Sequence, residues 1–283
     1  MAVIIDGKAL AAKVRDQARH DVDELKERGI EPGLAVVLVG DNQASATYVR
    51  AKLRDCEQCG IPSHDFKLPA DTSQVELLEL IGRLNEDAAI AGILVQMPLP
   101  RHLDEEAVVS AIRPDKDVDG FHPENLGRLV RGLPGLRPCT PAGIMCMLDE
   151  HGIDPAGKSA VIVGRSSIVG KPMALMLLAR DATITVSHSR TADVAAVCQT
   201  ADIVVAACGI AHMIKGDWLK PGATVIDVGM DRDEAGKLCG DVDFESAEPV
   251  AGAITPVPGG VGPMTRAMLM SNVVLAARMQ HGL

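Results

Sequence analysis

Short apolar runs rich in β-branched residues alternate with helical stretches along the chain, and this alternation limits the folds open to it. The runs cover residues 34–40, 91–97, 159–164, 182–187, 201–207 and 223–229. Each has the length of a strand, and its continuous apolar character predicts burial on both faces of a sheet. Helical patterns lie between the runs, at residues 7–29, 43–59, 73–87 and 168–180. Such alternation indicates βαβ units, so the predicted fold class is α/β with a mainly parallel sheet.

A boundary between two domains is predicted at residues 131–141, RGLPGLRPCTP, which are dense in proline and glycine. The length of 283 residues suits two domains of ordinary size. We expect a first domain over residues 1–140 and a second, doubly wound Rossmann-type domain over residues 141–261. The pattern alone leaves open whether the last helical stretch, from about residue 262, returns to the first domain.

Composition excludes several classes of function. Hydrophobic residues make up 47% of the chain and charged residues 23%, which is typical of an ordered globular protein. The formal net charge of −10 disfavours a nucleic-acid partner. The start MAVIIDGKAL lacks the features of a signal peptide, and no run reaches the ~18 apolar residues of a membrane span. Seven widely spaced cysteines do not form a disulfide framework, so we expect reduced thiols and a cytoplasmic location.

A cofactor site is predicted where the apolar run 159–164 ends. The segment GRSSIVGKP, residues 164–172, turns this strand into a helix, which is where dinucleotide folds bind pyrophosphate. Gly164 matches the first glycine of G-x-G-x-x-G, but Ser166 and Val169 occupy the other two positions. We therefore expect the cofactor to lie displaced from its usual depth. Taken alone, the loop is equally typical of a tight strand-to-helix turn.

The end of the following strand favours NADP over NAD. An NAD enzyme usually carries an acidic residue there, about twenty residues after the loop. This chain has HSRT, residues 188–191, with Ser189 and Arg190 but no carboxylate. Arg165 supplies a second cation, and two guanidinium groups with hydroxyls suit the extra phosphate of NADP. The alternative is a pair of solvated surface arginines.

A second group of candidate residues lies in the first predicted domain. Tyr48 and Lys52, in TYVRAKL, lie one helical turn apart and share a helix face. Gln96 ends a predicted strand, and Asp119 lies with two other aspartates in the loop PDKDVDGFHPENLGRL. Ligands of open α/β sheets gather outside the carboxyl ends of strands. An exposed helix face and loop-capping aspartates would explain the same residues, and spacing alone does not choose.

Over nearly its whole length the chain resembles the bifunctional methylenetetrahydrofolate dehydrogenase/methenyltetrahydrofolate cyclohydrolase family. The stretches that carry the resemblance are SATYVRAKLRDCEQCGI, GILVQMPLP, PDKDVDGFHPENLGRL, PCTPAGI, VIVGRSSIVGKP, HSRT and TPVPGGVGPMT, in the family's order. Two positions depart from the family pattern: Met97 replaces a usual leucine, and Arg266 stands where an aliphatic residue is common. The resemblance implies that the C-terminal helix, residues 262–283, rejoins the first domain, that the substrate lies between the domains, and that the enzyme is a homodimer.

The resemblance also implies a reaction and a role for each candidate residue. NADP-dependent oxidation of methylenetetrahydrofolate would give methenyltetrahydrofolate, and hydrolysis would convert this to formyltetrahydrofolate. Lys52 would move protons in the hydrolysis, held by Gln96, because an ammonium beside a cationic substrate in a closed site gives up its proton more readily. Tyr48 would stack on the folate, and Asp119 would accept paired hydrogen bonds from the pterin. The folate site would also include Pro258, Gly259 and Gly260, and the NADP site Thr140, Gly164, Arg165, Ser166, Ser189 and Arg190.

Other activities fit the sequence less well. Short-chain dehydrogenases also use Tyr-x-x-x-Lys, but their glycine-rich loop precedes this motif, whereas here it follows. The segment CEQC at 56–59 lacks a second ligand pair, and His122 and His188 read as polar loop residues, so no metal site is expected. The chain has no G-x-x-x-x-G-K-[ST] loop, so it does not encode the ATP-dependent formate ligase fused to some relatives. A catalytically silent folate- or NADP-binding module remains the alternative function.

Overall fold

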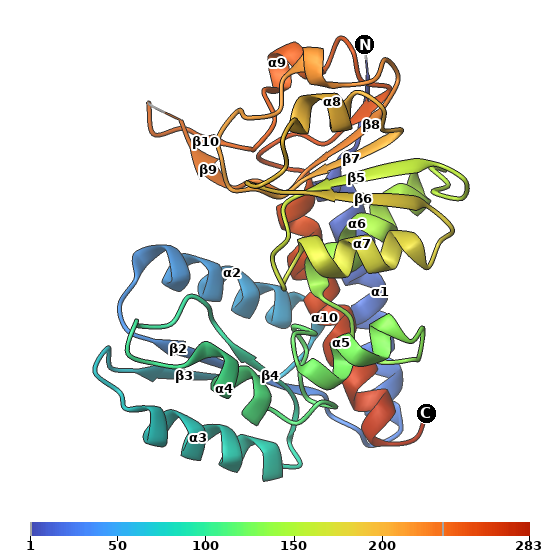
Figure 1. Ribbon diagram of the computed structural model, residues 1–283. Helices are drawn as coiled ribbons and strands as arrows, with labels where there is room; N and C mark the ends of the chain where they lie inside the picture. Colours follow the sequence, from blue (N-terminus) through green and yellow to red (C-terminus); the bar gives the residue numbers. More distant parts are fainter. Residues whose placement is uncertain (1, 234) are drawn as a thin grey trace. The chain divides into compact units, whose positions relative to one another are not determined.

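The chain forms two compact α/β units. The computed structural model describes residues 2–233 and 235–283 (Figure 1). One unit comprises the residues up to Ala11 together with Thr140–Thr265, and we call it the six-stranded unit. The other comprises Ala12–Cys139 and Arg266–Leu283, and we call it the three-stranded unit. The three divisions fall inside α1 (Gly7–Glu27), after the first residue of α6 (Cys139–Glu150) and inside α10 (Val261–Gln280).

The six-stranded unit is built on a parallel sheet with the strand order β1-β11-β8-β7-β5-β6. Its strands are β1 Val3–Ile4, β5 Ser159–Val163, β6 Thr183–Ser187, β7 Ile203–Ala206, β8 Thr224–Asp227 and β11 Ala253–Ile254. From β5 the chain passes to β6 on one side and then to β7 on the other. The sheet is therefore doubly wound, as predicted, with its topological switch point between β5 and β7.

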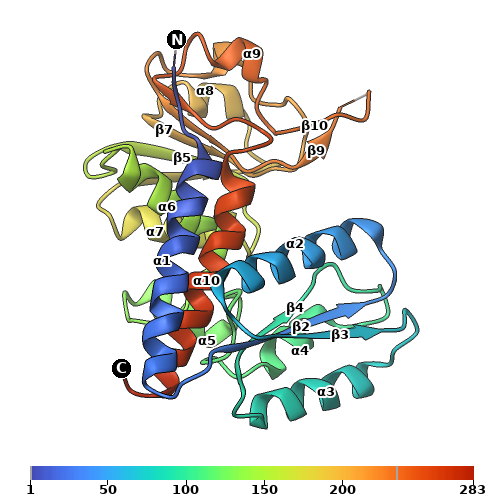
Figure 2. The ribbon, with the colours of Figure 1, turned by 180° about the vertical axis from the view of Figure 1, so that it is seen from behind.

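Helices cover both faces of this sheet. Helices α6 (Cys139–Glu150) and α7 (Gly170–Leu178) lie on one face, and α8 (Val194–Cys198) and α9 (Phe244–Ala247) lie on the other (Figures 1 and 2). The central strands β7 and β8 are buried along their whole length, which explains the apolar sequence IVVA of β7 and the apolar centre of β8, TVID. The unit also contains a short 3₁₀ helix, Gly216–Trp218, and an antiparallel hairpin, β9 (Asp231–Arg232) and β10 (Leu238–Cys239).

The first strand corrects the predicted domain limits, which assigned residues 1–140 to one domain. Val3 and Ile4 pair with Ala253 and Ile254 of β11, so the residues up to Ala11 belong to the six-stranded unit. Both β1 side chains are exposed, and a two-residue strand carries no periodic pattern. The sequence therefore gave no signal for this pairing.

The three-stranded unit has a parallel sheet with the order β3-β2-β4, and its central strand separates two apolar cores. The strands are β2 Gly33–Val39, β3 Ser63–Leu68 and β4 Ile90–Val95. Leu34, Val36 and Leu38 pack with α1, α2 (Gln43–Cys59) and α10. Ala35, Val37 and Val39, which point to the opposite face, pack with α3 (Gln74–Glu86) and α4 (Glu105–Ala111). The edge strand β3 was not predicted, because its sequence SHDFKL is polar and largely exposed.

Buried polar side chains fix the irregular segments of this unit. Lys116, which is 3% exposed, donates from Nζ to the carbonyl oxygens of Leu84 and Asp87 at the end of α3. Asn272 of α10 donates from Nδ2 to the carbonyl oxygens of Val118 and Arg137, both at 2.8 Å. The α10 helix is thereby joined to two loops, one of which leads directly into Asp119. A further helix, α5 (Pro123–Val130), follows that loop.

Among the residues that the structure describes, no helix is both long enough and apolar enough to cross a membrane.

We predict that Asn272→Ala destabilises the protein, because the carbonyl of Arg137 would lose this donor and that of Val118 would keep only the weak thiol donor of Cys139. An unsatisfied buried polar group costs about 1–3 kcal/mol, so the free energy of unfolding should fall by about 2 kcal/mol or more. Urea denaturation followed by circular dichroism measures this change. Ser271→Ala, at the neighbouring position of the same helix, is the control and should change stability by less than about 0.5 kcal/mol. Equal stability of the two variants would contradict the role of Asn272.

Candidate active site

Helix α2 positions Tyr48 and Lys52. The helix begins after Asn42, whose side chain accepts a hydrogen bond from the backbone N–H of Ser45 at 3.0 Å. It ends at Gly60, which has the left-handed conformation typical of a C-terminal cap. Its apolar face is buried in the core, which leaves Tyr48 39% exposed and Lys52 half-buried. The two side chains share a helix face, as the spacing predicts.

The structure brings Lys52 and Gln96 together, although they lie 44 residues apart in the sequence. The Nζ atom of Lys52 donates to Oε1 of Gln96 at 3.1 Å. Gln96 directly follows β4, and its backbone N–H donates to the carbonyl oxygen of Val37 at 2.8 Å. Its side-chain Nε2 donates to the carbonyl oxygen of Met97 at 2.6 Å. Because the amide nitrogen is used in this way, the amide oxygen of Gln96 faces the lysine.

The three aspartates of the loop after α4 have different roles. Asp117 is buried, and its carboxylate accepts from the backbone N–H of Gly120 and His122 and from the side chain of Asn125. Asp115 forms an ion pair with Arg113 at 2.7 Å. In the part of the chain that the structure describes, no group hydrogen-bonds to the Asp119 carboxylate. Two of the aspartates therefore build the loop, and the third remains open to a ligand.

The charges of Lys52 and Asp119 act on each other. Burial raises the pKa of Asp119 above its usual value, the positive charge of Lys52 lowers it, and the negative charge of Asp117 raises it. Cys139 is buried nearby, and its thiol donates to the carbonyl oxygen of Val118 at 3.3 Å. Burial and the charge of Asp119 raise the pKa of Cys139 well above its usual value. The site thus combines the side chains of Lys52 and Asp119 with a buried thiol whose pKa is raised.

Sequence reasoning missed Asn272 and Cys139, which support the loop that carries Asp119. Asn272 also donates to the Cys139 sulfur, at 3.4 Å. A signal for Asn272 was present, because it is a lone amide in the apolar run MLMSNVVLAA. Cys139 had no comparable signal, since a buried cysteine resembles any small apolar residue.

The CEQC segment of α2 is not suited to redox chemistry. Cys56 and Cys59 are buried free thiols. Burial raises the pKa of Cys56 to about 12 and that of Cys59 to about 11. Both remain protonated at neutral pH, whereas the thiolate is the reactive form.

The loop after β5 is tightly packed at its first residue. Gly164 has a φ of +125°, and a Cβ atom there would lie 2.0 Å from the carbonyl oxygen of Ala207, so only glycine fits. The hydroxyl of Ser166 accepts from the backbone N–H groups of Val169 and Gly170 at the start of α7. These two amides therefore already have an acceptor. A phosphate approaching this loop meets the exposed residues Arg165 and Ser166 first.

The turn after β6 presents Ser189 and Arg190 to solvent. The backbone N–H of His188 donates to the hydroxyl of Thr191 at 3.0 Å, and that of Arg190 donates to Nδ1 of His188 at 3.1 Å. Since β5 and β6 are neighbouring parallel strands, Arg165 and Arg190 follow strand ends on the same edge of the sheet. His188 thus shapes a turn, and His122 likewise accepts from the N–H of Glu124 at the start of α5.

Tyr48, Lys52, Gln96 and Asp119 belong to the three-stranded unit. The other residues predicted for the folate and NADP sites belong to the six-stranded unit, and among them are Thr140, Pro258, Gly259 and Gly260. The loop of Pro258, Gly259 and Gly260 follows β11. The carbonyl oxygen of Gly259 accepts from the N–H of Lys8, and a Cβ atom at Gly260 would lie 2.7 Å from the carbonyl oxygen of Pro256. The hydroxyl of Thr140 bonds to that of Thr265 at 2.9 Å.

A doubly wound sheet with a glycine loop, and a separate unit with a lysine–carboxylate site, define a two-domain enzyme with a dinucleotide-binding fold. Residues 5–119 match the family described as tetrahydrofolate dehydrogenase/cyclohydrolase, catalytic domain, and residues 138–281 match its NAD(P)-binding domain. The chain belongs to the tetrahydrofolate dehydrogenase/cyclohydrolase family.

Individual relatives are similar over the full length of the chain. The bifunctional protein FolD of Magnetococcus marinus is 59% identical over 284 residues and covers 100% of both chains. That of Moorella thermoacetica is 60% identical over 277 residues, 98% of this chain and 99% of its own. The crystal structure of bifunctional FolD from Campylobacter jejuni matches with a TM-score of 0.97 at 48% identity, covering 99% of this chain and 100% of its own. The Trypanosoma brucei structure, complexed with NADP cofactor and inhibitor, matches with a TM-score of 0.95 at 40% identity. It covers 100% of this chain and 99% of its own.

Proposed function

We propose that this enzyme catalyses two consecutive steps of one-carbon folate metabolism. It oxidises methylenetetrahydrofolate to methenyltetrahydrofolate with NADP, and it hydrolyses that product to formyltetrahydrofolate. The observation that carries the proposal is the Lys52–Gln96 pair beside Asp119, in a chain whose two halves match the two domains of the family. An absorbance assay that follows methenyltetrahydrofolate, with NADP and with NAD, tests it directly. A silent binding module would neither form nor consume this product.

The oxidation depends on orientation more than on acid–base chemistry. NADP, when bound, supplies the acceptor for the hydride that leaves the methylene carbon. The neighbouring folate nitrogens stabilise the resulting cation, so the chain's own task is to hold the reactants. Asp119 accepts hydrogen bonds from the pterin, and the ring of Tyr48 stacks on it. Pro258, Gly259, Gly260 and Thr140 would complete the binding of the two ligands.

The hydrolysis needs a group that moves protons. Water adds to the methenyl carbon, one proton must leave that water, and another must reach the ring nitrogen as the carbon–nitrogen bond breaks. We assign this transfer to Nζ of Lys52. Gln96 offers only its oxygen to the lysine, because its nitrogen is bonded to Met97. Gln96 therefore holds Lys52 as a donor without competing for the proton.

We predict that Lys52→Met separates the two activities. Methionine keeps length and apolar bulk but removes the titrating group, so hydrolysis should fall by a factor on the order of 10² or more. Oxidation should persist in part, because it depends on positioning. Methenyltetrahydrofolate should then accumulate during oxidation and be visible as absorbance that does not decay.

Tyr48→Phe is the matched variant, since it keeps the aromatic ring and loses only the hydroxyl. It should reduce hydrolysis less than Lys52→Met. Unimpaired hydrolysis by the Lys52→Met enzyme would show that this helix face has no catalytic role.

We predict a clear preference for NADP over NAD, carried by Arg165 and Arg190. Replacing either with Gln should weaken NADP about tenfold, since a hydrogen bond between charged groups is lost, and leave NAD nearly unchanged. The measurement is kcat/KM for each cofactor. Arg180→Gln is the control, because Arg180 is bonded to Asp149 at 2.8 Å on the same unit. Equal efficiency of the wild type with both cofactors would rule out this assignment.

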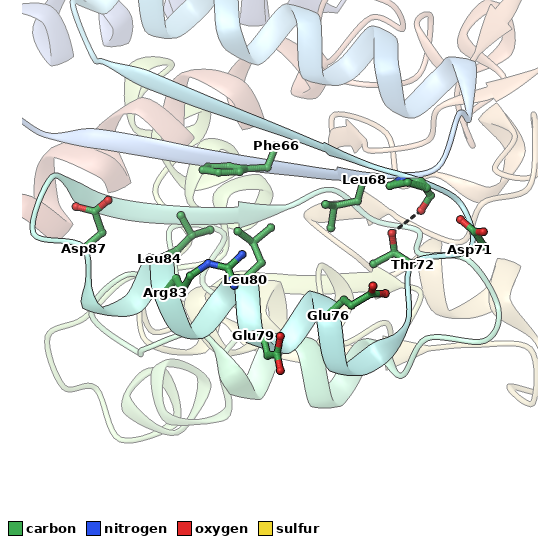
Figure 3. A pocket seen from close by; sticks show the side chains of 11 residues that line it. Phe66, Leu68, Asp71, Thr72, Glu76, Glu79, Leu80, Arg83, Leu84 and Asp87 are labelled. Carbon is green, nitrogen blue, oxygen red and sulfur yellow. Dashed lines mark hydrogen bonds between the residues drawn. The ribbon is translucent and has the colours of Figure 1, made fainter.

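We also propose that the enzyme is a homodimer formed across strand β3. Among the described residues, this strand pairs with β2 alone, and exposed strand edges are usually covered. Beside it lies a hollow of about 700 Å³ between β3 and α3 (Figure 3). Phe66, Leu68 and Leu80 supply its apolar surface, while Arg83 and several carboxylates also line it. Side chains of both charges suit pairing with a second copy, because a two-fold interface is self-complementary.

Phe66→Asp should convert the dimer to a monomer, because it introduces a charge at the proposed contact. Light scattering coupled to size-exclusion chromatography measures the molar mass. Val75→Asp is the control, since Val75 is exposed on α3 and does not line the hollow. A monomeric wild type, or a dimeric Phe66→Asp variant, would exclude this interface.

We place the enzyme in the cytoplasm. Its seven cysteines are free thiols, and five of them are buried. Structural disulfides belong to oxidising compartments, and a chain with thinly spread thiols is typical of a reducing one.

A further inference from the structure

The turn after β7 lies at the edge of the sheet where doubly wound folds bind ligands. The strand ends at Ala206, and the chain then turns through Cys208, Gly209 and Ile210. Because β5 and β7 flank the topological switch point, the loops that follow them border the place where doubly wound sheets bind ligands. The two loops approach closely, since a Cβ atom at Gly164 would lie 2.0 Å from the carbonyl oxygen of Ala207.

A single buried carboxylate holds this turn. The Oδ2 atom of Asp241 accepts from the backbone N–H groups of Cys208 at 2.7 Å and Gly209 at 3.2 Å. Its Oδ1 atom accepts from the backbone N–H of Ile210 at 2.8 Å. Asp241 is 0% exposed, so these charge-assisted bonds form away from water. Three consecutive amides of the turn are therefore fixed by one side chain.

A second buried carboxylate holds the segment that carries Asp241. Asp227 is the last residue of β8, and its Oδ1 accepts from the N–H groups of Gly229 and Asp241, both at 2.9 Å. Its Oδ2 accepts from the N–H of Val242 at 3.0 Å. Burial raises the pKa of Asp227 to about 7, and the three N–H donors act in the opposite direction. A continuous chain of hydrogen bonds thus runs from the end of β8 to the turn after β7.

We propose that Asp241 is a positioning residue for NADP, which fixes the 208–210 backbone on the side of the cofactor site opposite Arg190. The inference rests on the proposed NADP dependence. If the extra phosphate lies at the turn after β6 and the pyrophosphate at the loop after β5, the nicotinamide half extends over the end of β7. The turn that Asp241 holds is then the surface against which this half lies.

Asp241→Asn tests the proposal, because the substitution places an amide NH₂ against backbone N–H donors. Isothermal titration calorimetry should show NADP affinity reduced about tenfold or more, and the KM for NADP should rise in parallel. Hydrolysis of methenyltetrahydrofolate, measured without NADP, should stay within about twofold, because it does not use the cofactor. Asp202→Asn is the control. Asp202 directly precedes β7, at the opposite edge of the same sheet, and accepts hydrogen bonds from the N–H of Ser159 and from Lys220. The Asp202→Asn variant should therefore bind NADP as the wild type does.

If the Asp241→Asn protein does not fold, Gly209→Ala tests whether the conformation of the 208–210 turn affects NADP binding. Gly209 has a φ of +68°, and nothing lies within 4 Å of a Cβ atom there, so alanine adds only backbone strain to the turn. If the free variant relaxes the turn and NADP binding restores it, the cost of about 1 kcal/mol for that conformation corresponds to about fivefold weaker NADP binding. Unchanged NADP binding in the folded variants would overturn the proposal for Asp241. Failure of the wild type to bind NADP would instead overturn the proposed function.

Discussion

Parallel pairing of strands determines where the chemistry of this protein can lie. In the six-stranded and the three-stranded sheet all strands run in the same direction, so the loops that follow them emerge at a common edge. Gln96 follows β4, Gly164 follows β5, and the turns of residues 188–191 and 208–210 follow β6 and β7. The opposite edge of the larger sheet carries pairs such as Asp202 and Lys220, which fasten strands and loops. One edge of each sheet thus carries the loops proposed to bind ligands, while the other carries contacts that stabilise the fold.

Buried carboxylates give the irregular loops the order that helices and strands receive from their own hydrogen bonds. Asp117, Asp227 and Asp241 each accept from several N–H groups, most of them in the backbone. Asp119 is different, because within the described ranges its carboxylate accepts from none. The number of hydrogen bonds that a carboxylate accepts therefore separates the aspartates that build loops from the one that is open to a ligand. Composition and residue spacing do not distinguish these two kinds of aspartate.

The sequence predicted those parts of the structure that local periodicity encodes. The central strands were found because burial on both faces removes polar residues from them, and the Lys52 helix face followed from the helical repeat. The same burial was expected of residues 182–187, but β6 lies at the edge of its sheet and is exposed or half-buried over most of its length. β1 and β3 were missed because their side chains are exposed or polar. Asp241 and Asn272 were also missed. The lone amide of Asn272 in an apolar run was a usable signal, but both residues bond to backbone groups far away in the sequence, and a backbone partner has no residue type that a pattern could match.

The discontinuity of the three-stranded unit has a consequence for its synthesis on the ribosome. Helix α10 supplies Leu269, Met270 and Val273 to the core that also contains Leu34 and Val36. Residues 140–265 are translated between the two parts of this unit, which takes about 6–25 s at 5–20 residues per second. During that interval the face of the nascent sheet that α10 will cover remains incomplete. The emerging polypeptide therefore presents an apolar surface on which a chaperone bound near the ribosomal exit can act until α10 has been translated and has packed.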